Sequence, residues 1–241
     1  MNSPSENISA RVLRAVRHFW QTRRRQTDKQ RVTGTRDQGV RGAVTGGAQM
    51  NGFVQLFTEL IAEAGIERDC IFHRQGLELP GYFRPEKQWD LLVVQENQLL
   101  VAVEAKSQVG PSFGNNFNNR TEEAMGSALD LWTAYREGVI NTTVRPWLGY
   151  VFLLEECEKS NRSVRVREPH FDVLPEFKDA SYCDRYRVFC RKLVRERHYS
   201  AAAFATSPEA RGRKVTYSEP ANDLSFELFV RSLVSHVRTY V

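Results

Sequence analysis

The chain has 241 residues, 41% of them hydrophobic and 26% charged, and its formal net charge at pH 7 is +5. Such a chain can bury a sizeable core, and we expect one domain over residues 1–241. It has no apolar run near the roughly 20 residues of a membrane span and no signal-peptide pattern, which argues against a membrane or exported protein and favours a cytoplasmic one. It has no CxxC or HExxH motif, which argues against a zinc site, and no G-x-S-x-G motif, which argues against a serine hydrolase.

The N-terminal segment is predicted to be an amphipathic helix over residues 7–27, followed by a loop. Apolar residues recur at helical spacing from Ile8 to Trp20, with arginines between them. Residues 32–49 are rich in glycine and threonine, show no periodicity and lack the phosphate-loop motif G-x-x-x-x-G-K-[ST], which predicts a long loop. We expect residues 1–48 to form an arm made of a basic helix and a Gly-rich loop.

Positive charge is concentrated in residues 17–31, RHFWQTRRRQTDKQR. A basic face is the electrostatic footprint of a nucleic-acid-binding protein. We therefore interpret Arg23, Arg24 and Arg25 as candidate contacts to DNA phosphates, with an ordinary solvated helix as the alternative.

A second helix is predicted over residues 50–64, ending at Gly65. A short strand around residues 70–73 follows, and then a hairpin over residues 89–106, WDLLVVQENQLLVAVEAK. Both hairpin strands are apolar at successive positions, which is typical of strands covered on both faces. The turn between them is predicted at residues 96–98.

Three charged residues stand at one end of this apolar hairpin. A hairpin that reflects about Asn97 puts Asp90 opposite Glu104. Lys106 then projects from the same strand face as Glu104. Two opposed carboxylates repel unless one is protonated or a cation lies between them. Because Mg²⁺ favours oxygen ligands, the spacing predicts a metal site with a lysine beside it, the alternative being a solvated rim with a surface ion pair.

The segment after the hairpin is polar and rich in asparagine. Residues 109–120, VGPSFGNNFNNR, are predicted to be a loop. A helix follows over residues 121–138, begun by Thr121 with early glutamates. Residues 147–156 read as a buried strand.

From residue 170 the chain is predicted to be helical. One amphipathic helix is expected within residues 185–207 and a last one at residues 224–241. The order of elements predicts an α/β fold in which a mixed central sheet is flanked by helices. We expect a catalytic core at residues 49–160 and a mainly helical C-terminal part at residues 161–241.

The order of elements, with Asp on one hairpin strand and Glu-x-Lys on the next, resembles the PD-(D/E)xK nuclease core. The blocks WDLLVV, EAKSQVGPSFGNNFNNRTEEA, EECEKS and SYCDRYRVFCRKLVRERHY closely resemble the XhoI family of type II restriction endonucleases. The resemblance covers most of the chain, roughly from residue 40 to residue 215. It departs from the superfamily's motif at Trp89, where that motif has a proline with no chemical role.

The resemblance implies a Mg²⁺-dependent homodimer that cuts both strands of duplex DNA at the palindrome CTCGAG. It implies a bacterial restriction system in which the enzyme is paired with a cognate DNA methyltransferase. Asp90 and Glu104 would hold Mg²⁺, with the carbonyl of Ala105 as a further ligand. Lys106 would stand near the attacking water or stabilise the developing negative charge.

Two assignments remain open from the residues alone. Glu59 or Glu63, on the helix before the hairpin, is a candidate outer-sphere carboxylate, and the alternative is an ordinary helix-surface glutamate. The amphipathic helices after residue 180 are candidates for part of the dimer interface, and the alternative is plain core.

The segment GNNFNNR is the candidate for reading the DNA sequence. It stands eight to fourteen residues after the catalytic lysine. Asn can pair bidentately with adenine, and Arg with guanine, in the major groove. The alternative is a turn-rich loop whose asparagines bond their own backbone. The candidate residues are Asn115, Asn116, Asn118, Asn119 and Arg120.

Three other functions remain compatible with the residues. They are a repair nuclease or junction resolvase of the same superfamily, a non-catalytic DNA-binding domain, and a protein-interaction module. The asparagine-rich segment favours sequence reading over the first. The complete Asp-Glu-Lys set favours an enzyme over the other two.

Overall fold

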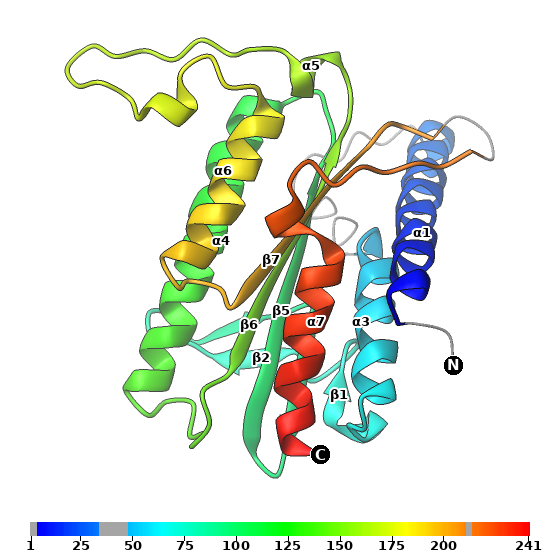
Figure 1. Ribbon diagram of the computed structural model, residues 1–241, viewed down its shortest axis with the longest axis vertical. Coiled ribbons are helices and arrows are strands. Elements are labelled where there is room, and N and C mark those ends of the chain that lie inside the picture. The colour runs from blue at the N-terminus through cyan, green and yellow to red at the C-terminus, as the bar shows by residue number, and fades with distance from the viewer. Residues whose placement is uncertain (1–3, 34–47, 211–213) are drawn as a thin grey trace.

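The computed structural model describes residues 4–33, 48–210 and 214–241, with side chains from residue 8 to residue 28 in the first range. Its centre is a five-stranded mixed sheet in the order β1-β4-β5-β6-β7 (Figure 1). The first three strands of this order pair antiparallel and the last three pair parallel. The strands are β1 (Ile71–Phe72), β4 (Leu91–Gln95), β5 (Gln98–Gln108), β6 (Trp147–Glu155) and β7 (Ala201–Ser207).

Helices cover both faces of the sheet (Figure 1). One face is covered by α1 (Pro4–Thr33), α3 (Asn51–Glu63) and α7 (Phe226–Val237), the other by α4 (Phe113–Arg136) and α6 (Tyr182–Arg195). Successive residues of β5 alternate between the two layers: Val101 and Val103 pack with the first set of helices, and Ala102 packs with the second. Burial on both faces explains the continuous apolar strands. The predicted mixed sheet flanked by helices is confirmed.

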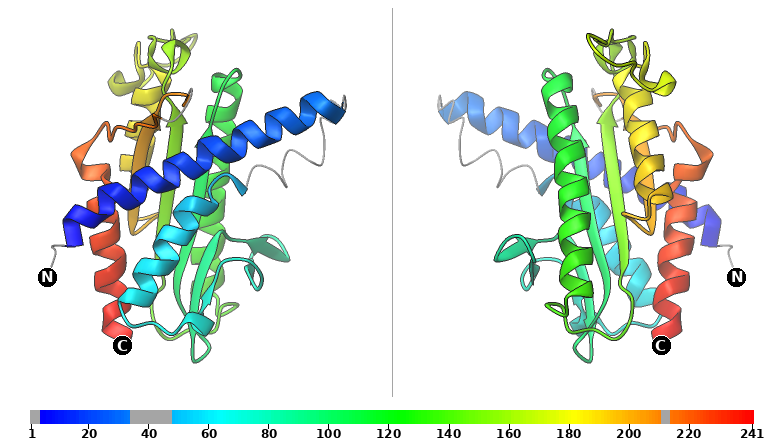
Figure 2. Two further views of the ribbon diagram at one scale, coloured as in Figure 1. Left: turned by 90° about the vertical axis from the view of Figure 1, so that its right-hand side faces the viewer. Right: turned by 90° about the vertical axis from the view of Figure 1, so that its left-hand side faces the viewer.

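The remaining elements of the described residues are short. They are α5 (Glu158–Asn161), the 3-10 turns Arg68–Cys70, Pro175–Phe177, Asn222–Leu224 and Arg238–Tyr240, and the antiparallel β2–β3 ribbon formed by β2 (Glu78–Pro80) and β3 (Glu86–Gln88). The ribbon projects on the same side of the molecule as the C-terminal half of α1 (Figure 2). Among the helices of the described residues, none combines the length and the apolarity that a membrane crossing requires.

The N-terminal helix is packed into the core over its first half. Its inward residues, from Ile8 to Phe19, are buried in one cluster with α3 and α7. Trp20 Nε1 donates a 2.9 Å hydrogen bond to Ser207 Oγ at the end of β7. Beyond this contact α1 extends away from the sheet (Figure 2).

Three predicted elements appear close to their expected bounds. The helix predicted at residues 7–27 is α1, the helix predicted at residues 50–64 is α3, and the strand around residues 70–73 is β1. The chain leaves α3 at Gly65, as predicted, because a φ of +115° suits glycine. The loop predicted at residues 32–49 lies almost entirely outside the described residues.

The hairpin of β4 and β5 has the predicted register at its charged end: Leu91 pairs with Val103, and continuing this pairing by one residue puts Asp90 opposite Glu104. The turn itself consists of two residues, Glu96 and Asn97, whose φ angles of 50° and 60° are both positive. Such a turn matches the twist of the flanking strands. The predicted turn was one residue too long, and an irregularity after Val93 restores the register.

The prediction of a loop over residues 109–120 is wrong for most of the segment. α4 begins at Phe113, well before the predicted start at Thr121. Asparagine has low helix propensity, which is why the sequence suggested a loop. The helix forms because Phe113 and Phe117, one turn apart, pack on aromatic side chains of α6, beginning with Tyr182. Tertiary packing therefore overrides local propensity here.

The prediction of one helix within residues 185–207 is also wrong. α6 ends at Arg195, and Ala201–Ser207 form β7, which pairs parallel to β6. Alanine favours helices in isolation, but β7 satisfies the backbone groups along one edge of β6. The C-terminal part expected to be mainly helical, residues 161–241, thus supplies a strand of the central sheet.

The amphipathic helices after residue 180 turn their apolar faces toward the sheet. α6 buries Tyr186 and Phe189, and α7 buries Phe229 and Leu233. These faces are core, which was the alternative to a dimer interface.

Candidate active site

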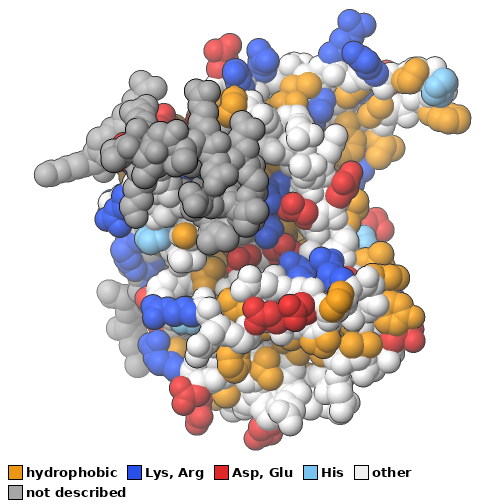
Figure 3. Space-filling model, turned by 180° about the vertical axis from the view of Figure 1, so that it is seen from behind, with side chains coloured by type: hydrophobic (Ala, Val, Ile, Leu, Met, Phe, Trp, Pro, Cys, Tyr) orange, Lys and Arg blue, Asp and Glu red, His pale blue; other side chains and the backbone are white. Residues whose placement is uncertain are grey.

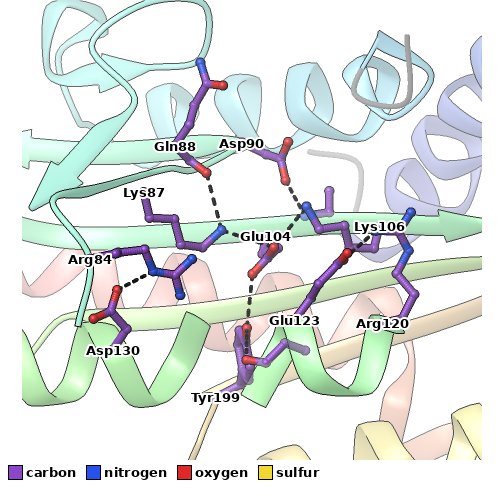
Figure 4. A network of polar contacts seen from close by, with 12 residues as sticks. Arg84, Lys87, Gln88, Asp90, Glu104, Lys106, Arg120, Glu123, Asp130 and Tyr199 are labelled. Carbon is purple, nitrogen blue, oxygen red and sulfur yellow. Dashed lines mark hydrogen bonds and ion pairs between the residues drawn. The ribbon is translucent and has the colours of Figure 1, made fainter. Parts of the chain in front are cut away.

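Asp90, Glu104 and Lys106 meet at one end of the central hairpin (Figure 4). Asp90 stands directly before β4, and its Oδ2 accepts a 2.8 Å hydrogen bond from the Ala105 N–H of β5. Lys106 Nζ lies 2.9 Å from Glu104 Oε1. The strand register therefore brings together the three residues that the sequence singles out.

Glu104 is a buried carboxylate, with 2% of its side chain exposed. Burial alone would raise the pKa of Glu104, but the ammonium groups of Lys106 and Lys87 outweigh it and hold this pKa below its usual value. Oε2 of Glu104 accepts a 3.3 Å hydrogen bond from Tyr199 Oη, and the same hydroxyl lies 3.0 Å from Ala124 O. Glu104 therefore stays ionised within a preformed set of donors.

Lys87 is a functional candidate that the sequence analysis missed. It comes from β3 of the separate ribbon, and its Nζ lies 3.2 Å from Glu104 Oε1. The same Nζ lies 4.5 Å from the centre of the Trp89 ring. The signal in the sequence is slight: Lys87 stands three residues before Asp90, and no local pattern shows that its side chain reaches Glu104.

The pKa values of Asp90 and Lys106 are both raised, but for different reasons. Burial raises the pKa of Asp90, although Lys106 and the Ala105 N–H oppose this change. Burial would lower the pKa of Lys106, but Glu104 and Asp90 outweigh it and hold this pKa above its usual value. Lys106 is therefore an ammonium at neutral pH, suited to hold a water or a phosphate oxygen.

The donors at this end of the hairpin fit a hard divalent cation. Asp90, directly before β4, and Glu104 of β5 supply carboxylate oxygens. Ala105 adds a backbone carbonyl. The N–H and the C=O of one strand residue point to the same side, and the N–H of Ala105 points at Asp90, so its carbonyl lies on the side of the site. Mg²⁺ prefers oxygen ligands and keeps several waters, so one or two carboxylates can be enough. Within the described ranges, no group of three or more His, Cys, Asp or Glu side chains is placed to hold a metal ion, so this site depends on two carboxylates and a carbonyl.

The three charged residues lie in a cleft of about 1090 Å³. Its walls are the C-terminal half of α1, the N-terminal end of α3, the β2–β3 ribbon and the first turns of α4. α1 and the ribbon, which form two of these walls, project on the same side of the molecule (Figure 2). In Figure 3, which shows this side, Lys, Arg, Asp and Glu side chains gather near the middle of the face. The site is therefore reachable from outside and lined by charged groups.

The candidate DNA-reading residues lie on different sides of α4, so that some of them line the cleft and others do not. Asn116 and Arg120, one turn apart on α4, line the cleft. Asn115, Asn118 and Asn119 are exposed on other sides of α4 and do not line it. A loop would leave all of these side chains free to turn toward DNA, whereas a helix fixes the direction of each.

Of the three candidate phosphate contacts on α1, Arg23 alone lines the cleft. It donates a 3.3 Å hydrogen bond to Gln49 Oε1, and burial lowers the pKa of Arg23. Arg24 donates to the carbonyl of Ala210, and Arg25 is exposed outside the cleft lining. The structure therefore separates three arginines that look equivalent in the sequence.

Neither candidate outer-sphere glutamate of α3 lines the cleft. Glu63 forms an ion pair with Arg11 at 2.7 Å, and Glu59 accepts a 3.1 Å hydrogen bond from Gln55 Nε2. The N-terminal end of α3 faces the cleft, and both glutamates lie toward its other end. They are helix-surface residues, as the alternative interpretation stated.

The chain is similar to known proteins over most of its length. The family model described as restriction endonuclease XhoI matches residues 29–219. The type II restriction enzyme BstVI of Geobacillus stearothermophilus is 52% identical over 209 residues, which cover 85% of this chain and 93% of that protein. The type II restriction enzyme XhoI of Xanthomonas vasicola is 49% identical over 183 residues, which cover 74% of this chain and 72% of that protein.

A third relative extends the comparison to another organism. The type II restriction enzyme AbrI of Azospirillum brasilense is 49% identical over 158 residues, which cover 65% of this chain and 71% of that protein. No solved structure gives a significant match.

Proposed function

Because the chain belongs to the XhoI family of type II restriction endonucleases, we propose that it cuts both strands of DNA at the palindrome CTCGAG with Mg²⁺ as cofactor. Membership of the family makes the protein a site-specific deoxyribonuclease. The observation that carries the proposal is the position of Asp90, Glu104 and Lys106 inside an open, charged cleft. Two carboxylates and an ammonium at one point suit the hydrolysis of a phosphodiester.

The residues of the site would divide the work of hydrolysis between them. Asp90 and Glu104, with the carbonyl of Ala105, would hold Mg²⁺. When bound, Mg²⁺ supplies Lewis-acid activation of the attacking water and of the scissile phosphate. Lys106 keeps its proton and donates hydrogen bonds to the water or to phosphate oxygens, stabilising the charge that develops there. Tyr199 Oη lies 3.3 Å from the second oxygen of Glu104 and shares its one hydrogen with Ala124 O at 3.0 Å.

Cationic side chains line the cleft where a phosphate backbone would pass. Two of them are Arg23 from α1 and Lys87 from β3. Phosphate contacts of this kind release counterions, so that affinity falls as salt rises. The net charge of +5 agrees with an anionic substrate.

Asn116 and Arg120 are the proposed contacts to base edges. Both line the cleft that holds Lys106, so that they face a duplex whose phosphate reaches the site. Asn pairs bidentately with adenine and Arg with guanine, and a CTCGAG site presents both bases. Arg120 also pairs with Glu123 at 2.6 Å, an exposed ion pair that is weak enough to be exchanged for a base.

The enzyme is expected to act as a homodimer. A palindromic site mirrors a twofold protein, and two strands need two active sites. Sedimentation on a duplex with one site should show two chains of 27.7 kDa per duplex. One chain bound to an intact site would contradict the dimer.

The decisive experiment compares two plasmids incubated with the purified protein and Mg²⁺. One plasmid carries a single CTCGAG site, and the other has one base of that site changed. The first should become linear with ends that map to the site, and the second should stay circular. A smear from both plasmids would indicate a general nuclease. Cutting confined to branched DNA would indicate a resolvase, and binding without cutting would indicate a DNA-binding domain.

A restriction enzyme needs a methyltransferase that protects the sites of its own host, and both would act in the bacterial cytoplasm. Expression should therefore be toxic in a host without matching methylation and tolerated in a host that makes the methyltransferase. Equal growth of both hosts, with active protein present in each, would contradict the pairing.

A further inference from the structure

The β2–β3 ribbon ends in two exposed aromatic side chains. Tyr82 and Phe83, in the loop that joins the strands, have exposed fractions of 49% and 66%. Their rings meet edge to face, with centroids 5.0 Å apart and an angle of 80° between the planes. Large aromatic side chains left in water on a projecting loop are typical of a binding surface.

A buried carboxylate holds this loop in one conformation. Asp130 of α4 has 4% of its side chain exposed. Its Oδ1 accepts 2.8 Å hydrogen bonds from the N–H groups of Tyr82 and Phe83. Its Oδ2 accepts a 2.8 Å hydrogen bond from Arg84 Nε. The loop lies so close that a Cβ at Gly81 would be 2.6 Å from Oδ2.

The rings are therefore presented on a rigid backbone. A contact residue that is already ordered loses less conformational entropy when it meets its partner. Rigid aromatic side chains also supply a large contact area for few rotatable bonds. Both features favour a preformed contact surface at Tyr82 and Phe83.

The ribbon leads from these rings into the cleft. Arg84, Lys87 and Gln88 line the cleft, and Lys87 contacts Glu104 inside it (Figure 4). The ribbon projects on the same side of the molecule as the C-terminal half of α1, whose Arg23 also lines the cleft (Figure 2). The major groove of DNA admits a two-stranded ribbon, and apolar side chains inserted between bases are a recurrent means of gripping a duplex. A duplex in the cleft is thus the partner within reach of the tip.

We propose that the β2–β3 ribbon is a DNA-contacting element, in which Tyr82 and Phe83 touch the bases of the duplex that occupies the cleft. Asp130 is the positioning residue that fixes the loop. This inference rests on the proposed function, because it takes duplex DNA as the substrate. It adds a contact surface that lies outside both the metal site and the recognition face of α4.

Photo-crosslinking tests the partner directly. A photoreactive phenylalanine analogue is placed at position 83 of the full chain and irradiated with a CTCGAG duplex in Ca²⁺, which permits binding without cutting. We expect a covalent product of protein and DNA. The same analogue at position 228, an exposed residue of α7 outside the cleft, is the control and should give none. A crosslink between two protein chains, or none while DNA is bound, would overturn the proposal.

Truncation of the rings measures their contribution. Tyr82→Ala combined with Phe83→Ala should weaken binding of the cognate duplex about tenfold or more, because aromatic contacts to bases are strong. The unfolding temperature should not change, since both rings are exposed. Leu228→Ala, the matched control, should bind as the wild type does. Equal affinities of the double variant and the control would overturn the proposal.

The two proposals fail in different ways. If the wild-type protein neither binds nor cuts the duplex, the proposed function and the ribbon contact both fail. If the wild type cuts the duplex but position 83 does not crosslink to it, the ribbon contact alone fails.

Discussion

Lys87 Nζ lies 3.2 Å from Oε1 of Glu104, although the two residues belong to different sheets. Lys106 Nζ lies 2.9 Å from the same oxygen, so that two ammonium groups share one buried carboxylate oxygen. A divalent cation at this oxygen would be repelled by both. We therefore expect one ammonium to move when a metal binds, and Lys87, on the separate ribbon, is the one that can move without disturbing the central sheet.

Lys87→Met should tighten the binding of Mn²⁺, used in place of Mg²⁺, several-fold in the absence of DNA, because it removes one repelling charge. Calorimetric titration or the Mn²⁺ electron spin resonance signal measures this without any cleavage. Lys178→Met is the matched control, since it removes the same charge from an ion pair with Glu168 outside the cleft. Unchanged or weaker Mn²⁺ binding by Lys87→Met would contradict the expectation.

Asp90→Asn, Glu104→Gln and Lys106→Ala should each lower the rate of DNA cleavage by orders of magnitude, because each removes a metal ligand or the cation beside the reacting phosphate. Single-turnover cleavage of a cognate duplex measures the rate, and thermal unfolding checks the fold. In Ca²⁺ the wild type should bind DNA without cutting it, since Ca²⁺ takes longer and looser coordination. If Asp90→Asn cuts at nearly the normal rate, the metal site is placed wrongly.

Arg23→Gln should weaken binding to every DNA sequence alike and make the logarithmic salt dependence shallower by about one unit, because one phosphate contact is lost. Arg25→Gln is the control: it lies on the same helix but outside the cleft. Dissociation constants over a salt series measure both effects. A loss of discrimination between sequences, with an unchanged salt slope, would contradict the assignment of Arg23 as a contact to a DNA phosphate.

Asn116→Ala and Arg120→Ala should each cost about 1–3 kcal/mol of discrimination between the cognate site and its single-base variants. Asn118→Ala, on an exposed side of the same helix, should cost little. Affinities in Ca²⁺ for the cognate duplex and each variant duplex measure the difference, and non-specific binding at low salt should persist. Equal losses on all duplexes would show that Asn116 and Arg120 hold the backbone and do not read bases.

The loop that carries Tyr82 and Phe83 should loosen in acid. Burial would raise the pKa of Asp130, but the N–H groups of Phe83 and Tyr82, together with Arg84, outweigh it and lower this pKa. Because the folded pKa lies below the unfolded value of about 3.9, this carboxylate stabilises the fold fully above that value and loses its effect as the pH falls through the folded pKa.

Hydrogen-exchange protection factors of the amides of Tyr82 and Phe83 measure this loosening. In the wild type, these protection factors should decrease once the pH is lowered below about 4. In Asp130→Asn they should be low already at neutral pH and change little in acid. A wild-type loop that keeps its protection through this pH range would contradict the role given to Asp130.

Local patterns in the sequence were sufficient for the central hairpin. Side chains alternate along a strand with a period of two, so the spacing of Asp90, Glu104 and Lys106 already puts them on one face. The continuous apolar run likewise indicated a strand buried on both sides. Where a segment's structure depends on distant partners, local patterns misled: α4 starts early because its phenylalanines meet α6, and the alanines of β7 extend because β6 lies beside them.

By itself, the sequence determined the hairpin, its paired carboxylates and the family to which the chain belongs. The tertiary structure alone decided that Lys87 joins Glu104, that Arg23 and not Arg25 faces the cleft, and that Asp130 holds the ribbon loop. Lys87 and Glu104 are 17 positions apart in the chain, and Asp130 binds groups 46 to 48 positions away. No helical or strand period extends over such separations, so these contacts arise from the way the ribbon, α1 and α4 pack around the hairpin.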